Sequence, residues 1–492
     1  MLALQKIHNT LKQQGVFVLL VLVLLFIFTS SFVGEKITLN DGVGYDGVFY
    51  YNVAQNFSTD FGTIGYDKFR IYRIFPFCLI NLFFRLFNIE TTHANLMLSM
   101  SIFHFLNLAI QLTFFFKLAR LNTWKKTTTA IIFSCFFFNY FFLKNCGYEI
   151  FQTDAFASTI FLVSFYFLQS QKYRLAISIS FLGILTWPTI TYILWLLYFF
   201  KDAFPQQAPR LKLHTGKTLA IAFPLLSASA VVTLFLLHKQ PLLESMLYIP
   251  ASIPLLLTSA IAWCIFLFVV FRHWNNQFYA PSTYIREFMH QLSWKKIAFI
   301  FIPFIALHIF LRAHTNNEFV FNETAFILQI LLRPLKYPII TPLAHISYFG
   351  IVPLLGIILF RHLSEDIFNR NAGYALAFLA FLFFATDTEA RHILPLLPLV
   401  LVPLASVLDK INLNVKSAVA LIVLQLVLSH FYIPINTDGF AEALESNNFN
   451  TVAQRYFMSF GPWMAFHTYI VWAAIYVFTA ILVSRIIKKR KI

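Results

Sequence analysis

The sequence predicts an all-helical, polytopic membrane protein that forms a single integral membrane domain over residues 1–492. Hydrophobic residues make up 59% of the chain and charged residues only 12%, whereas soluble domains carry about 25% charged residues. Apolar stretches recur that are long enough, at about 1.5 Å per residue, to cross a hydrocarbon core of about 30 Å. Examples are Val16–Val33, Thr218–Leu237, Leu247–Phe271, Tyr337–Phe360 and Thr468–Ser484. A barrel is excluded, because barrel strands need only about ten residues of alternating polarity.

The first apolar stretch predicts an uncleaved membrane anchor. Met1–Gln14 carries Lys6 and Lys12 ahead of Val16–Val33, which resembles a signal peptide. The apolar run is longer than a typical signal core, however, and no Ala-x-Ala site follows it. The cysteines have no C-x-x-C spacing, so we expect them to fill space in the core; they are Cys78, Cys135, Cys146 and Cys264.

The distribution of charge predicts the topology. With the N-terminus in the cytoplasm, we expect about 12–14 spans, beginning near residues 16, 95, 127, 151, 175, 188, 218, 247, 297, 337, 372, 391, 416 and 468. The cytoplasmic loops then hold 25 of the 37 Lys and Arg residues but only 5 of the 21 acidic residues. This split follows the positive-inside rule and places both termini in the cytoplasm.

Residues 173–200 need separate treatment, because basic residues flank the segment at both ends. Pro188 lacks an amide donor and biases Trp187 away from helical geometry. We therefore predict two short helices that enter and leave the membrane on the cytoplasmic side and meet near Trp187.

The first external loop, residues 34–93, is the expected catalytic loop, and residues 436–467 form the last external loop. Glycines and carboxylates gather early in the first loop, around Asp41 and Asp46. The stretch from Ile74 to Phe87 is too short and too punctuated for a span, so we expect an interfacial helix from which Arg85 snorkels toward water.

One motif in this loop carries a resemblance. It reads Tyr45-Asp46-Gly47-x-x-Tyr50-Tyr51-x-x-Ala54, directly after the first span, with Arg73-Ile-Phe-Pro76 downstream. It resembles the GT-C superfamily of polytopic, mannosyltransferase-like enzymes that take sugars from polyprenyl-phosphate donors. Weaker echoes follow in the expected order, at residues 148–154, 185–189 and 387–398. The sequence departs from the family in having Trp187 where a basic residue is usual, no Asp-x-Asp pair and no large C-terminal domain.

The resemblance implies an inverting glycosyltransferase whose catalytic aspartate lies in the first loop. Asp46 is the expected general base, and the tyrosines Tyr45 and Tyr50 are suited to contact sugars. Asp46 and Asp41 could instead make local turn bonds, which are common for aspartate, and this reading is favoured for Asp41. Glu149 and Asp154 either shape the substrate site or cap a helix.

The leaving phosphate needs cations near the membrane surface. We expect Arg391, with Arg333 or Lys336, to bind the donor phosphate, although Arg391 and His392 could merely anchor a span. The full set of cationic candidates is Arg73, Arg312, Arg333, Lys336, Arg391 and His392.

The expected partners are a polyprenyl-phosphate sugar donor, a glycan or glycolipid acceptor and the lipid bilayer. No cofactor or metal motif is visible, and the basic tail indicates membrane anchoring and not nucleic-acid binding. The short loops favour a bacterial inner membrane, with the site facing the periplasm. Two alternatives remain, namely a lipid-linked-sugar transporter or flippase and an O-antigen ligase or polymerase with a large late external loop.

Overall fold

The computed structural model describes residues 2–200, 252–274, 292–316, 323–436, 445–446 and 463–488. Within these ranges the chain is helical apart from two strands of two residues, so the predicted all-helical class is confirmed there. The predicted loop at residues 436–467 and the crossing that was expected to begin near residue 218 lie largely or wholly outside the described residues.

In the described residues up to 200, the chain forms eleven helices and helical turns. They are α1 (Leu2–Val33), α2 (Gly47–Thr63), the short turn η1 (Arg70–Arg73), α3 (Phe75–Leu86), α4 (His93–Leu121), α5 (Lys126–Phe137), the π-helical turn η2 (Phe141–Asn145), α6 (Cys146–Tyr148), α7 (Asp154–Gln169), α8 (Tyr173–Ile184) and α9 (Pro188–Phe199).

The second half continues this helical architecture. Its described elements are α12 (Ile253–Trp274), α14 (Trp294–Arg312), α15 (Glu323–Leu332), the short turn η3 (Arg333–Leu335), α16 (Ile340–Phe349), α17 (Val352–Ile358), α18 (Phe360–Phe368), α19 (Ala372–Phe384), the turn η4 (Ala390–Leu396), α20 (Leu397–Ile411), α21 (Val415–Leu428) and α23 (Phe466–Lys488). The strands β1 (Tyr66–Asp67) and β2 (Thr315–Asn316) pair in parallel.

Five helical segments of the described chain are long and apolar enough to cross a membrane: Gly15–Val33, His93–Leu121, Trp294–Arg312, Ala390–Ile411 and Phe466–Ile487. A sixth is possible if α5 and the segment Phe141–Tyr148, which are bent by 53° relative to each other, act as one span. Seven further apolar helices of 10–17 residues accompany them. Several of the predicted crossings therefore coincide with helices shorter than a full span.

The predicted crossing at Tyr337–Phe360 is wrong as a continuous helix, because the chain forms α16, α17 and the start of α18 instead. The break falls at Gly350, whose φ of 65° is open to glycine but strained for other residues. Gln425 satisfies the exposed backbone: its Oε1 accepts from the Ile351 N–H at 2.8 Å, and its Nε2 donates to the Phe349 carbonyl at 3.1 Å. Irregular backbone at membrane depth needs such protein partners.

The predicted pair of short helices in residues 173–200 is confirmed. Helices α8 and α9 pack against each other and meet at Trp187, which has an extended backbone ahead of Pro188. Thr191 Oγ1 donates to the Ser180 carbonyl at 2.9 Å, and Trp195 Nε1 donates to Ser180 Oγ at 3.0 Å. The two helices thus form a hairpin.

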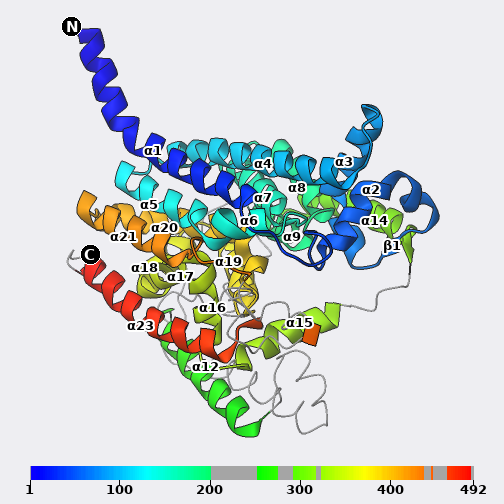
Figure 1. Ribbon diagram of the computed structural model, residues 1–492. Coiled ribbons are helices and arrows are strands. Elements are labelled where there is room, and N and C mark those ends of the chain that lie inside the picture. The colour runs from blue at the N-terminus through cyan, green and yellow to red at the C-terminus, as the bar shows by residue number, and fades with distance from the viewer. Residues whose placement is uncertain are drawn as a thin grey trace.

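The two ends of the bundle are built from different segments of the chain (Figure 1). Both chain termini lie at one end, whereas α2, α3 and β1 lie at the other. Ahead of α5, Lys125 Nζ donates to the Asp409 carbonyl of α20 at 2.9 Å, and Arg370, after α18, pairs with Asp366 at 2.9 Å. The charge count places all four of these residues on the cytoplasmic side. At the end that holds β1, the Tyr66 N–H donates to the His314 carbonyl at 3.0 Å and ties the first loop to the end of α14.

The first loop has its own small core. The Tyr50 ring stacks on Phe77 with centroids 4.5 Å apart, and Phe77 and Phe151 are fully buried. The predicted short helix after Ile74 is present as α3, which buries one face on α2 and exposes Arg85 on the other. This packing fixes the position of α2, whose first residue follows Asp46.

Candidate functional site

Asp46 lies where the first loop turns into α2. Its side chain accepts no hydrogen bond from the helix N-terminus, so the local turn bond considered from the sequence is not formed. Instead, Oδ1 lies 2.9 Å from Nη2 of Arg70, and Oδ2 lies 4.0 Å from Nη2 of Arg391. With 36% of the side chain exposed, the carboxylate remains accessible to a ligand.

Glycines let the segment after α6 approach this loop. A Cβ on Gly44 would lie 3.0 Å from Oε1 of Glu149, and one on Gly47 would lie 3.2 Å from Cβ of Phe151. Gly44 also has a φ of 87°, which other residues rarely adopt. Glycines beside a carboxylate can leave room for a ligand to approach. In the structure these two glycines make room for residues 149–151, which brings the Glu149 side chain close to the loop that holds Asp46.

Glu149 has a perturbed acidity. Burial raises its pKa, Arg391 opposes that effect, and the negative charges of Asp46, Asp154 and Glu389 reinforce it, so that the pKa reaches about 7. Asp154, the first residue of α7, is 2% exposed, and its Oδ1 has no hydrogen-bond partner among the described residues. It does not act as the N-cap, which is Thr153. Glu149 and Asp154 therefore join Asp46 in one acidic group.

An ion-pair cluster lies before α20. Oε1 of Glu389 accepts a hydrogen bond from Arg391 Nε at 2.5 Å, and Oε2 accepts one from Arg333 Nη1 at 2.7 Å. Asp387 Oδ2 lies 2.8 Å from His392 Nδ1 and 3.3 Å from Arg333 Nη1. Burial disfavours the charged form of Glu389, but His392, Arg391 and Arg333 outweigh it and hold its pKa well below the usual range.

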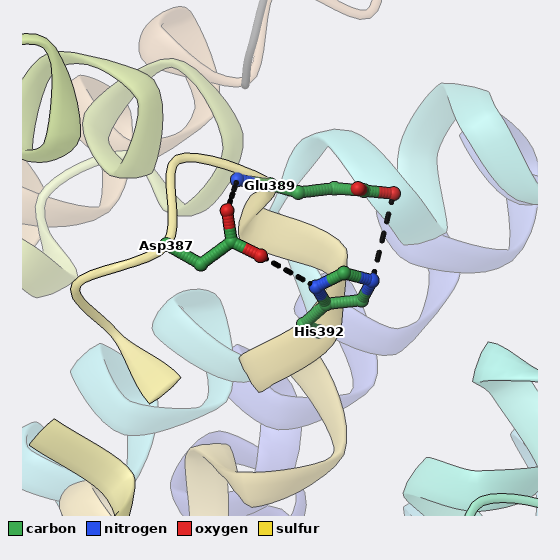
Figure 2. A group of neighbouring side chains, drawn as sticks. All are labelled: Asp387, Glu389 and His392. Atoms are coloured by element: carbon green, nitrogen blue, oxygen red, sulfur yellow. Dashed lines mark hydrogen bonds and ion pairs between the residues drawn. The ribbon is translucent and has the colours of Figure 1, made fainter. Parts of the chain in front are cut away.

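The acidic side chains of this cluster lie close enough for a metal ion. In Figure 2, His392 faces both carboxylates, and the ligand atoms of Asp387, Glu389 and His392 lie within 4.8 Å of one another. The carboxylate oxygens, however, already accept hydrogen bonds from Arg333, Arg391, His392 and the Glu389 N–H. Two guanidinium groups therefore balance the two carboxylates, and the arrangement is that of a buried ion-pair network.

Arg73 has a different environment. Its guanidinium carbon lies 4.2 Å from the ring centre of Trp187 and 4.4 Å from that of Phe69. The Trp187 ring in turn lies 5.5 Å from the ring of His392. Burial raises the pKa of Tyr50, while Arg73 lowers it and Asp46 raises it, which places the Tyr50 hydroxyl within reach of both charges. Arg73 and Asp46 therefore both lie near the Tyr50 hydroxyl.

The remaining predicted residues are placed less centrally. Asp41 is exposed with a φ of 52°, and Tyr45 is 40% exposed, with a pKa raised to about 12 by burial and by Glu149. Arg312 is exposed at the end of α14. Lys336 is 3% exposed, and burial lowers its pKa to about 7. The contacts above do not bring Asp41, Arg312 or Lys336 to Asp46.

Three important residues were not selected from the sequence. Arg70 stands in a charged run, and nothing in that run distinguishes it from its neighbours. Asp387 and Glu389 belong to the segment that was noted for its resemblance, but only Arg391 and His392 were chosen there. The signal for these acids was available, because carboxylates two and four residues before a cationic site residue are natural ion-pair partners.

Comparisons with protein-family models, with curated proteins and with solved structures give no match for this chain. The site must therefore be interpreted from its own residues and geometry.

Proposed function

We propose that the protein is a membrane glycosyltransferase of the GT-C type, which transfers a sugar from a polyprenyl-phosphate donor to a glycan or glycolipid acceptor. The observation that carries the proposal is the meeting of Asp46, Arg70 and Arg391 at one end of a bundle of apolar helices. A carboxylate flanked by cations at a membrane surface suits a substrate that has a hydroxyl nucleophile and an anionic, lipid-linked leaving group.

In this reaction the acceptor hydroxyl attacks the anomeric carbon of the donor. The new bond joins the acceptor oxygen to that carbon, the bond from the carbon to the phosphate oxygen breaks, and its electron pair leaves with the polyprenyl phosphate. Asp46 takes the hydroxyl proton, and Arg70, at 2.9 Å, holds its carboxylate in place. Direct displacement inverts the anomeric centre.

The proposed orientation follows from charge. By the charge count, the loops assigned to the side of the two termini hold 25 of the 37 Lys and Arg residues, which favours the cytoplasm for that side. The end with Asp46 then faces the outside, which in a bacterial inner membrane is the periplasm. A donor headgroup would reach Asp46 there without entering the apolar core.

The test is direct. Purified protein in nanodiscs is incubated with a panel of radiolabelled polyprenyl-phosphate sugars and an extract of glycolipid acceptors, and the label that leaves the donor is counted. We expect one donor to lose its sugar to an acceptor, and Asp46→Asn to abolish most of that transfer. A panel on which the protein releases no sugar would refute the proposal.

A lipid-linked-sugar transporter is the second candidate, because transporters use discontinuous helices at membrane depth. The bend of 53° after α5, the break at Gly350 and the α8–α9 hairpin are discontinuities of this kind. Movement of a fluorescent lipid-linked sugar across liposomes containing the protein, with no sugar transfer, would favour this candidate.

A further inference from the structure

The cations of the site differ in whether a carboxylate neutralises them. Arg70 pairs with Asp46, Arg391 with Glu389, and Arg333 with both Glu389 and Asp387. Arg73, by contrast, makes no ion pair with a carboxylate in the described part of the chain. An anionic ligand at Arg391 or Arg333 has to compete with carboxylates that are already bound. At Arg73 the polar partners are the Tyr50 hydroxyl, through a hydrogen bond, and Asp154, through its charge but without an ion pair.

Aromatic rings hold Arg73 in position. The guanidinium lies 4.2 Å from the Trp187 ring and 4.4 Å from the Phe69 ring, distances at which cation–π attraction is effective. Trp187 is 6% exposed and is fixed at the tip of the α8–α9 hairpin, so it offers a rigid surface. The planar faces of a guanidinium can stack on rings while its edge N–H groups remain free to bind an oxyanion.

The same contact joins two segments that are far apart in the sequence. Arg73 comes from the first loop, and Trp187 lies where α8 and α9 meet, so the stack places the guanidinium of the loop against the hairpin. The Trp187 ring also lies 5.5 Å from the ring of His392, which places the stack beside the ion-pair cluster.

We infer that Arg73, held by Trp187 and Phe69, is the residue that binds the phosphate of the lipid-linked substrate, in place of Arg391 and Arg333. The identification of the anion as a lipid-linked phosphate rests on the proposed function. Arg391 and Arg333 then serve to hold the segment before α20 through Glu389.

The experiment measures binding and needs no turnover. Farnesyl phosphate is titrated into the purified full-length protein in nanodiscs of neutral lipid, and the Kd is obtained by microscale thermophoresis. The variants are Arg73→Gln, Arg73→Lys, Trp187→Leu and Arg391→Gln. Arg85→Gln is the matched control, because Arg85 is an exposed arginine on α3 of the same loop. The Tm of each variant checks its folding.

We expect Arg73→Gln to weaken binding by about 10- to 100-fold, the loss typical of a charge-assisted contact. Arg73→Lys should recover part of the affinity as a point charge, and Trp187→Leu should lose about three- to tenfold through loss of the stack. Arg85→Gln should bind as the wild type does. Unchanged affinity in Arg73→Gln, together with a loss in Arg391→Gln, would overturn the inference.

Two further titrations test whether the bound phosphate belongs to a polyprenyl phosphate, to free phosphate or to a phospholipid headgroup. Inorganic phosphate and phosphatidylglycerol are titrated against bound farnesyl phosphate. We expect neither to displace it at comparable concentration, and equal displacement by either would overturn the assignment to a polyprenyl phosphate. The two proposals also fail separately. Transfer that persists at normal donor affinity in Arg73→Gln refutes this inference alone, whereas Arg73-dependent binding without any sugar transfer refutes the proposed function alone.

Discussion

The guanidinium of Arg391 lies 4.0 Å from the carboxylate of Asp46, so the segment that precedes α20 meets the start of α2 at one point. The same guanidinium is bound through Nε to Glu389 at 2.5 Å. Arg391 thereby links the accessible carboxylate of the first loop to a buried ion-pair network. This link suggests how the chemistry and the stability of the site can be separated by mutation.

Asp46→Asn should remove catalysis and spare the fold. Asparagine keeps the size of the side chain but cannot accept the proton, so turnover should fall by about 10² to 10⁴. Donor affinity should change little, because Asp46 is not the proposed phosphate ligand. Turnover and donor Kd are measured in the same purified variant.

Asp41→Asn is the matched control for this experiment, because Asp41 is an exposed carboxylate of the same loop. We expect nearly normal turnover. A severe loss in Asp41→Asn, with normal turnover in Asp46→Asn, would move the base to Asp41.

Glu149 should make stability depend on pH near neutrality. Its pKa is raised from 4.5 to about 7, so between these values the folded protein keeps a proton that the unfolded chain has released. The contribution of Glu149 to the free energy of unfolding is therefore full at low pH. It falls by about 1–3 kcal/mol as the pH rises toward 7. The Tm of wild type and Glu149→Gln, measured from pH 4.5 to 8.5, should therefore diverge in favour of the variant as pH rises. Parallel Tm curves would contradict the raised pKa.

Glu389→Gln should be strongly destabilising. Glu389 and Arg333 have side chains 4% and 5% exposed, and loss of the carboxylate leaves buried guanidinium groups without their counter-charge. Breaking such a pair costs about 3–5 kcal/mol. The control is Glu365→Gln, whose partner Arg361 is 63% exposed, and an exposed pair contributes about 0–1 kcal/mol. Thermal unfolding in detergent compares the two, and equal shifts in Tm would argue against a buried network.

Gly183→Ala should loosen the α8–α9 hairpin. A Cβ at this position would collide with Thr191 Oγ1 and lie 3.1 Å from Cγ1 of Ile190. Thr191 cannot easily yield, because its hydroxyl is bonded to Ser180. We expect a loss of about 1–3 kcal/mol, the usual cost of overpacking. Gly356→Ala, where a Cβ meets nothing within 4 Å, should be neutral or stabilising, and a loss of Tm as large as that of Gly183→Ala would count against the packing explanation.

The orientation of the bundle can be tested by cysteine labelling. Gly62 in α2 and Lys416 in α21 are both exposed, and a Cβ at Gly62 meets nothing within 4 Å. In a background without the partly exposed Cys264, an impermeant maleimide should label Gly62→Cys in intact spheroplasts and Lys416→Cys only after lysis. Labelling of position 416 alone in intact spheroplasts would show that the orientation is opposite to the one proposed.

Much of the architecture could be predicted because it depends on the hydropathy and backbone preferences of residues that are neighbours in the sequence. The apolar runs of α1 and α23, the hairpin around Pro188 and the helix after Ile74 follow from hydropathy and from the geometry of proline over neighbouring residues. Predictions failed where one distant side chain decides the backbone. The break at Gly350 depends on Gln425, which no window around residue 350 contains.

The sequence by itself determined that the chain is helical and apolar and that Asp46 stands in a glycine-rich loop after the first long helix, and it predicted that the basic residues gather on one side of the membrane. Only the tertiary structure decided which charges meet: Arg70 and Arg391 at Asp46, Glu389 between two guanidinium groups, and Arg73 on Trp187. The physical reason is that hydropathy adds up along the chain, whereas an ion pair or a stacked ring depends on a separation of a few ångströms between segments that helix packing brings together.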